Sequence, residues 1–118
     1  MLSEYHSDPM HRTRIALDDL IEVAARNSGI LPSLSEFERT DPHNSPNAFR
    51  LYHYFEKWAV LARTDNLDNE LLIAALGGRV GWWQEKFFRP IAARETDQHI
   101  LKSLREIEIQ VLSKTTAQ

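Results

Sequence analysis

Apolar residues recur every three or four positions over most of the chain, a spacing that predicts amphipathic helices rather than strands. The strongest such stretch runs from Asp68 to Ile91 and holds two of the three tryptophans and two of the five phenylalanines. Its apolar positions are Leu72, Ala75, Leu76, Val80, Trp83, Phe87 and Ile91. A large aromatic side chain buries about 150–250 Å², so we expect the other segments to pack on this helix.

Helix start and stop signals divide the rest of the chain. Asp8-Pro9 and Ser45-Pro46 each combine a capping residue with a proline at the first helical position. Ser33 to Glu36 matches a capping box, and Thr96 or Asp97 caps the last helix. The predicted helices span residues 8–28, 33–39, 46–64, 69–91 and about 97–114. The sequence therefore predicts one all-α domain over 1–118, a compact bundle of four main helices plus one short helix, with loose tails at 1–7 and 115–118.

Two features interrupt the long central helix. Gly77-Gly78 predicts a kink or a close approach of another helix, because a glycine inside a helix costs about 1 kcal/mol relative to alanine. Pro90 lacks the backbone N–H and is expected to bend or end the helix near Phe88. In the last helix Ile100, Leu104, Ile107 and Val111 form an apolar seam suited to packing on a neighbour.

Charge and composition narrow the classes of function. The 118 residues carry a net charge of −3, with basic residues spread along the chain, which argues against a nucleic-acid-binding protein. The chain has no cysteine and hence no disulfide or thiolate metal site. No apolar run approaches the roughly 18 residues of a membrane span, and the N-terminal residues lack the apolar segment of a signal peptide. We expect a cytoplasmic protein with no membrane partner.

No motif for catalysis or cofactor binding stands out. The five histidines are His6, His11, His43, His53 and His99, and none belongs to an HExxH pattern. A zinc site needs three or four converging ligands, and the glycine-rich stretch at 77–81 lacks the GK[ST] of a phosphate loop. We therefore predict no catalytic residue, no metal site and no cofactor, which favours a non-enzymatic protein.

The sharpest polar signal is Glu56 and Arg63, which lie inside the edge of the apolar arc of the 46–64 helix. They are two turns, or about 10 Å, apart along the axis, too far for a direct pair. Each is expected to find a partner on another helix. One interpretation is a partly buried ion pair that fixes the two central helices. The alternative is a pocket lined by Glu56, Arg63 and Arg79 that binds a small ligand.

The aromatic pairs Trp82-Trp83 and Phe87-Phe88 suggest an interaction surface. Neighbours in a helix point about 100° apart, so both members are buried only where the helix is covered on more than one side. Exposed aromatic and arginine side chains are typical of interaction hot spots. The predicted interaction residues are Trp82, Phe88, Arg79, Lys86 and Arg89.

The stretches Phe55 to Ala59, Leu67 to Leu71 and Trp82-Trp83 leading to Arg89-Pro90-Ile91 resemble one bacterial family over about residues 10–95. It is a domain of unknown function in small helical proteins, many of which carry an N-terminal membrane anchor. The matching positions are Glu56, Asp68, Trp83 and Arg89. The resemblance implies an all-helical domain in which these residues pack and cap, and it implies no activity. We expect no such anchor in this chain.

Three functional hypotheses remain. The first is a non-enzymatic interaction or regulatory module that binds another protein, such as a phage-type inhibitor of a host defence complex. A homodimer burying the Trp82/Phe88 side or the 100–111 seam is a second version of it. The alternative is a small-ligand-binding or hydrolytic domain that uses Glu56, Arg63 and Arg79. The third is nucleic-acid contact through a local basic stripe of Arg79, Lys86, Arg89 and Arg94.

Overall fold

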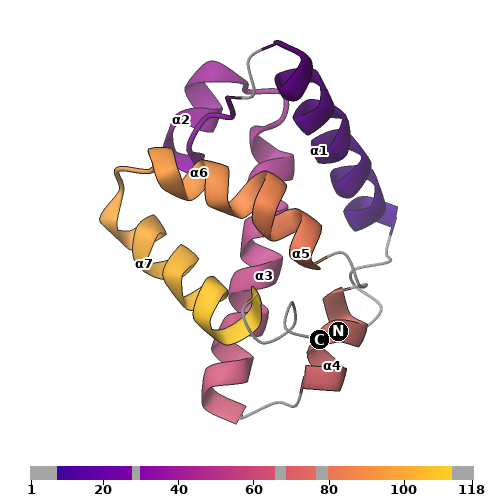
Figure 1. The fold of residues 1–118 in the computed structure, drawn as a ribbon, viewed down its shortest axis with the longest axis vertical. Coiled ribbons are helices and arrows are strands. Elements are labelled where there is room, and N and C mark those ends of the chain that lie inside the picture. Colours follow the sequence, from indigo (N-terminus) through magenta and orange to yellow (C-terminus); the bar gives the residue numbers. More distant parts are fainter. Residues whose placement is uncertain (1–7, 28–29, 66–68, 77–79, 113–118) are drawn as a thin grey trace.

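The computed structural model of the protein describes residues 8–27, 30–65, 69–76 and 80–112, and all regular structure in these ranges is helical (Figure 1). The elements are α1 (Asp8–Asn27), α2 (Leu34–Thr40), α3 (Ser45–Asp65), α4 (Asn69–Leu76), α5 (Val80–Trp83), the π-helix η2 (Gln84–Phe88), α6 (Arg89–Arg94), α7 (Gln98–Ile107) and the π-helix η3 (Glu108–Leu112). This confirms the predicted all-α bundle. No helix among the described residues is long and apolar enough to cross a membrane.

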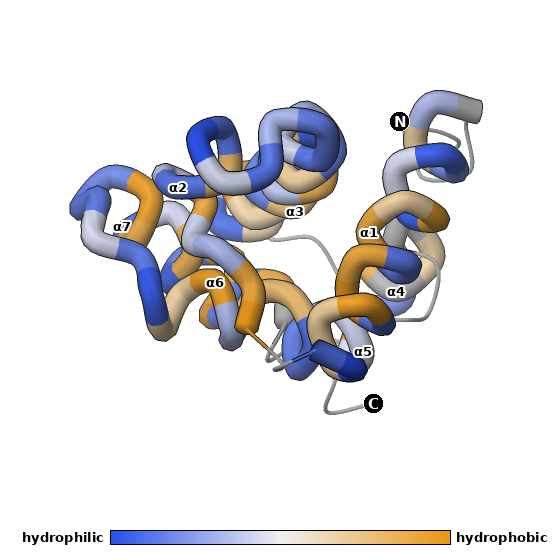
Figure 2. Tube along the Cα trace, turned by 90° about the horizontal axis from the view of Figure 1, so that it is seen from above, coloured by the Kyte–Doolittle hydropathy of each residue, from blue (hydrophilic) through white to orange (hydrophobic). Residues whose placement is uncertain are grey.

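The helix α3 is the centre of the arrangement. It runs along the long axis of the molecule and packs against α1, α2, α7 and η3, while the α5–η2–α6 run crosses in front of it (Figure 1). Seen from above, hydrophobic residues recur along α1 and α6, whereas the turn into α7 is hydrophilic (Figure 2). The structure therefore places α3, rather than the 68–91 stretch on which the other segments were expected to pack, at the centre of the helices.

Large apolar side chains from nearly all of these helices form a single core. The largest fully buried ones are Leu17, Leu34, Phe37, Leu51, Phe55, Leu72, Trp83, Phe87, Ile91 and Ile107. Burial of a side chain of this size contributes about 1.5–3 kcal/mol. Trp58 and Trp83 are both buried, as expected for the two aromatic-rich helices. Leu104, Ile107 and Val111 are buried and Ile100 is partly buried, so most of the predicted seam packs inside the protein.

A capping side chain explains where α7 begins. The Asp97 carboxylate accepts hydrogen bonds from the backbone N–H groups of His99 (2.9 Å) and Ile100 (3.1 Å) and so starts α7. The capping box at Ser33 is wrong in its detail, because the Ser33 hydroxyl donates to the Glu36 carboxylate (2.9 Å) and makes no bond to the helix backbone. The helix α2 itself forms as predicted.

The stretch predicted as one helix over 69–91 is described as α4, α5, η2 and α6, and it does not end near Phe88, which was one of the two effects predicted for Pro90. After α4 the chain continues as α5, widens into the π-helix η2, and then returns to the regular helix α6 with Pro90 in its first turn. The wide π turn directly before it places the missing N–H of Pro90 where a helix start tolerates it. The helical path therefore passes through the proline.

Several expectations concern residues outside the described ranges. These are the tails 1–7 and 115–118, the helix end at Ser28-Gly29, the Asp68 cap, the Gly77-Gly78 kink, Arg79 and the helix end at Lys114.

Candidate functional site

The predicted interaction surface is only partly formed. Phe88 is 4% exposed, with its ring centroid 4.8 Å from that of Phe55 and 5.1 Å from that of Phe87, so its assignment to an exposed surface is wrong. Trp82 is half-buried and packs edge-to-face on Trp83, with centroids 4.9 Å apart. The aromatic pairs of this segment thus serve the core.

The basic residues of the same segment are placed differently. Lys86, Arg89 and Arg94 are exposed, while Arg79 lies outside the described residues. Arg89 lines a small cleft of about 210 Å³ between η2, α6 and α7. The lining residues of this cleft are Gln84, Phe88, Arg89, Ala92, Leu101, Leu104, Arg105 and Glu108. The nucleic-acid hypothesis stays a prediction.

Glu56 is the centre of a hydrogen-bond network that joins α3 to α7. Its Oε2 atom accepts hydrogen bonds from the hydroxyls of Ser103 (2.5 Å) and Tyr52 (3.3 Å), and its Oε1 atom lies 3.1 Å from Nδ1 of His53. The expected partner of Glu56 on another helix is therefore Ser103, a hydroxyl rather than a cation. Among the residues that the structure describes, no interhelical ion pair is formed at Glu56.

The network sets the charge state of Glu56. Burial would raise the pKa of Glu56, but the hydrogen bonds from Ser103, His53 and Tyr52 outweigh it and lower the pKa below its ordinary value. Burial and the neighbouring Glu56 carboxylate also raise the pKa of the Tyr52 phenol. Glu56 is thus a carboxylate at neutral pH, and Tyr52 remains a proton donor to it.

A pocket of about 620 Å³ opens beside this network, between α3 and α7. Its lining residues are His53, Glu56, Lys57, Ala59, Val60, Leu61 and Arg63 from α3, and His99, Lys102, Ser103 and Glu106 from α7. On α7 the lining positions follow helical spacing, which places them on one face of the helix. Ala59 and Ser103 have small side chains, so the contact between α3 and α7 leaves open a space that larger side chains would fill.

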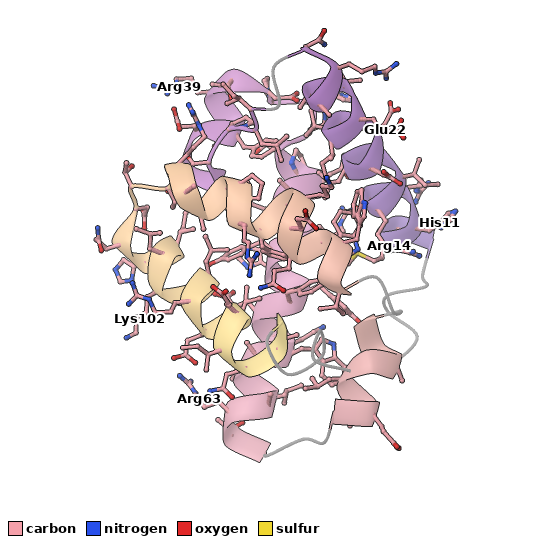
Figure 3. The ribbon with its side chains drawn as sticks, in the orientation of Figure 1. His11, Arg14, Glu22, Arg39, Arg63 and Lys102 are labelled. Atoms are coloured by element: carbon pink, nitrogen blue, oxygen red, sulfur yellow. The ribbon has the colours of Figure 1, made fainter. Side chains whose placement is uncertain are left out.

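The charges around the pocket are unevenly satisfied. Lys57 Nζ lies 5.6 Å from the ring centroid of Tyr54, in cation–π range. Arg63 and Lys102 are exposed and lie on the same side of the molecule, one on each helix (Figure 3). Over the part of the chain that the structure describes, neither makes an ion pair or a hydrogen bond through its side chain. The predicted protein partner for Arg63 is therefore not found in that part.

The pocket brings together two residues that the sequence singled out and several that it did not. Glu56 and Arg63 both line it, as the small-ligand alternative requires. Ser103, Lys102 and His99 were not singled out, because they lie on the polar face of α7 like any solvent-facing residue. Among the described residues, no three His, Asp or Glu side chains are grouped so that they could hold a metal ion.

Comparisons with known proteins add no relative. No protein-family model matches the chain, and neither the curated proteins nor the solved structures contain a significant match. The resemblance to the bacterial family of small helical proteins therefore stays a prediction.

Proposed function

We propose that the protein is a non-enzymatic binding module that takes up a small molecule in the α3–α7 pocket. The observation that carries this proposal is the pocket, whose volume of about 620 Å³ falls in the range of roughly 300–1,000 Å³ typical of small-molecule sites. Its lining combines apolar side chains with a few charged ones, a mixture that gives a ligand both contact area and orientation.

The polar network supports binding rather than hydrolysis. A nucleophilic serine needs a general base that removes its proton. The acceptor of the Ser103 hydroxyl is Glu56, and the lowered pKa of this carboxylate makes it a weak base for removing that proton. His53 contacts the other oxygen of the same carboxylate. The hydrogen bonds therefore position Glu56 and join two helices, which suits a preformed wall of a binding site.

The protein-interaction hypothesis stays a prediction beside this proposal. Phe88, which was predicted to lie on the aromatic interaction surface, is in the core, and the apolar seam of α7 is largely buried. A small-molecule pocket between two helices is compatible with a regulatory module, since a ligand that binds the folded state stabilises the seam between α3 and α7.

The test is a fluorescence titration with N-phenyl-1-naphthylamine, a neutral apolar probe. Val60→Trp fills the pocket from an exposed position, and Val23→Trp on α1 is its matched control, since the two valines are 45% and 42% exposed. We expect saturable binding, one probe per chain, to the wild type and to Val23→Trp, and none to Val60→Trp. Equal binding to the two variants would contradict the proposal. So would the lack of saturable binding both of this probe and of 1-anilinonaphthalene-8-sulfonate, its anionic analogue.

A further inference from the structure

We infer that the ligand of the α3–α7 pocket is an amphipathic anion. Its acidic group is held between Arg63 and Lys102, and its apolar body lies on Ala59, Val60 and Leu61. This inference rests on the proposed binding function and names the class of molecule that the site takes.

The two cations carry the first part of the argument. Arg63 and Lys102 line the same pocket from different helices, and both side chains extend on the same side of the molecule (Figure 3). Within residues 8–27, 30–65, 69–76 and 80–112 neither has a carboxylate partner. An acidic group between them would gain two charge-assisted hydrogen bonds, which are stronger than neutral ones.

The carboxylates of the pocket carry the second part. Glu56 already accepts hydrogen bonds from Ser103 and Tyr52 and lies beside His53, so its charge is stabilised without a cationic ligand. Glu106 lines the pocket one turn beyond Lys102 on α7 and will repel an acidic group. The pocket lining still holds more cations than carboxylates, which favours an anionic ligand. A substitution of Glu106 therefore tests the sign of the ligand's charge.

Two simpler ligands would each use only part of the pocket. A bare inorganic anion would bind the cations but leave the exposed Val60 and the half-buried Leu61 uncovered. A purely apolar molecule would cover them but displace water from Arg63 and Lys102 without a compensating charge, which is unfavourable. A molecule with an acidic group and an apolar body satisfies both parts, and the methylene stems of the two cations extend the apolar surface.

The experiment compares two probes that share their aromatic rings and differ by one sulfonate. These are 1-anilinonaphthalene-8-sulfonate, the anionic probe, and N-phenyl-1-naphthylamine, the neutral probe. We expect the anionic probe to bind the wild type about fivefold more tightly or better, an advantage that shrinks in high salt because exposed charges are screened. The anionic probe should also raise the thermal unfolding temperature, as any ligand of the folded state does.

Charge variants then place the sulfonate. Arg63→Met and Lys102→Met should each weaken binding of the anionic probe about three- to tenfold and should not weaken binding of the neutral probe. Arg12→Met and Lys86→Met are the controls, because they remove the same charges from exposed positions outside the pocket. Glu106→Gln should tighten binding of the anionic probe about two- to threefold. Circular dichroism and thermal unfolding verify that each variant is folded.

The outcomes distinguish a failure of this inference from a failure of the proposed binding function. One outcome is that the neutral probe binds and Val60→Trp blocks it, while the anionic probe binds no more tightly and is unaffected by Arg63→Met and Lys102→Met. In that case the ligand is not an anion, and the proposed binding function stands. If Glu106→Gln weakens the anionic probe, the assigned charge is wrong. If neither probe binds, or Val60→Trp has no effect on either, both the inference and the binding function are overturned.

Discussion

Two glutamates of this protein accept several hydrogen bonds each, Glu95 at the turn between α6 and α7 and Glu56 in the middle of α3. Glu95 is 7% exposed, and its donors are the backbone N–H groups of Ser35 (3.1 Å), Thr96 (3.2 Å) and Asp97 (3.1 Å) and the Ser35 hydroxyl (2.6 Å). It thereby joins the start of α2 to the start of α7. The donors around Glu56 are all side chains, and its carboxylate borders an open pocket.

The pKa of each glutamate is lowered, although burial acts against it. For Glu95 the hydrogen bonds from Ser35 and from the backbone of Asp97 and Thr96 outweigh burial, and for Glu56 the hydrogen bond from Ser103 leads. A lowered pKa therefore marks a carboxylate whose hydrogen bonds are satisfied, not a functional site by itself. Access to a cavity is what distinguishes Glu56 from Glu95.

The largest expected loss of stability follows from a substitution of Glu95. Glu95→Ala should reduce the free energy of unfolding by about 2–3 kcal/mol, because the N–H groups at the starts of α2 and α7 lose their acceptor. Urea denaturation measures the loss. Glu38→Ala, an exposed position on α2, is the control and should stay within about 0.5 kcal/mol of the wild type. A loss at Glu95 as small as that of the control would show that its hydrogen bonds are not structural.

Acid should remove the same contribution. The pKa of Glu95 is lower in the folded state than in the unfolded state, so the folded state binds fewer protons and its stability rises with pH. The advantage of the wild type over Glu95→Gln is therefore full near neutral pH and is lost as the pH falls through the lowered pKa. Urea denaturation of both proteins over a pH series measures it. A difference that stays constant into acid would contradict this account.

The smallest expected loss of stability follows from a substitution of Glu56. Glu56→Gln should cost about 1 kcal/mol, because the amide keeps the shape but weakens the bond with Ser103, and the groups left behind reach water. Urea denaturation checks the value, and the variant should retain the pocket and the binding of the neutral probe. A cost above that of Glu95→Ala would reverse the comparison and make Glu56 the main structural carboxylate.

Much of the fold follows from local signals in the sequence. The predicted helix starts at Ser45-Pro46 and Asp97 agree with α3 and α7, and at Asp97 the side chain caps the neighbouring backbone N–H groups. The burial of Phe88 did not follow from them. Its neighbour Phe87 is buried as well, since the segment is covered on more than one side and widens into a π turn there. The packing of Phe88 on Phe55 joins residues that are distant in the sequence.

The site was predictable to a smaller extent. Glu56 carried a signal, a charged residue at the edge of an apolar arc, and the structure gives it a role in a pocket wall. Its partner Ser103 lies 47 residues away, and Ser35 lies 60 residues from Glu95. Polar residues on an amphipathic helix look alike in the sequence, so only the packing of α7 on α3, and of the α6–α7 turn on the start of α2, reveals which of them meet.

The π-helix η2 lets the helical run hold one residue more than a regular helix with the same number of turns. A π turn holds more residues than an α turn, so removing one residue from Gln84–Phe88 would restore a regular helix and leave α5 and α6 in the same relative orientation. Ile91 would then stay in the core, and Glu95 would stay beside Ser35. The same deletion inside a regular helix would instead turn everything beyond it by about 100°. The wide turn is thus the place where this run can lose a residue and still keep its contacts.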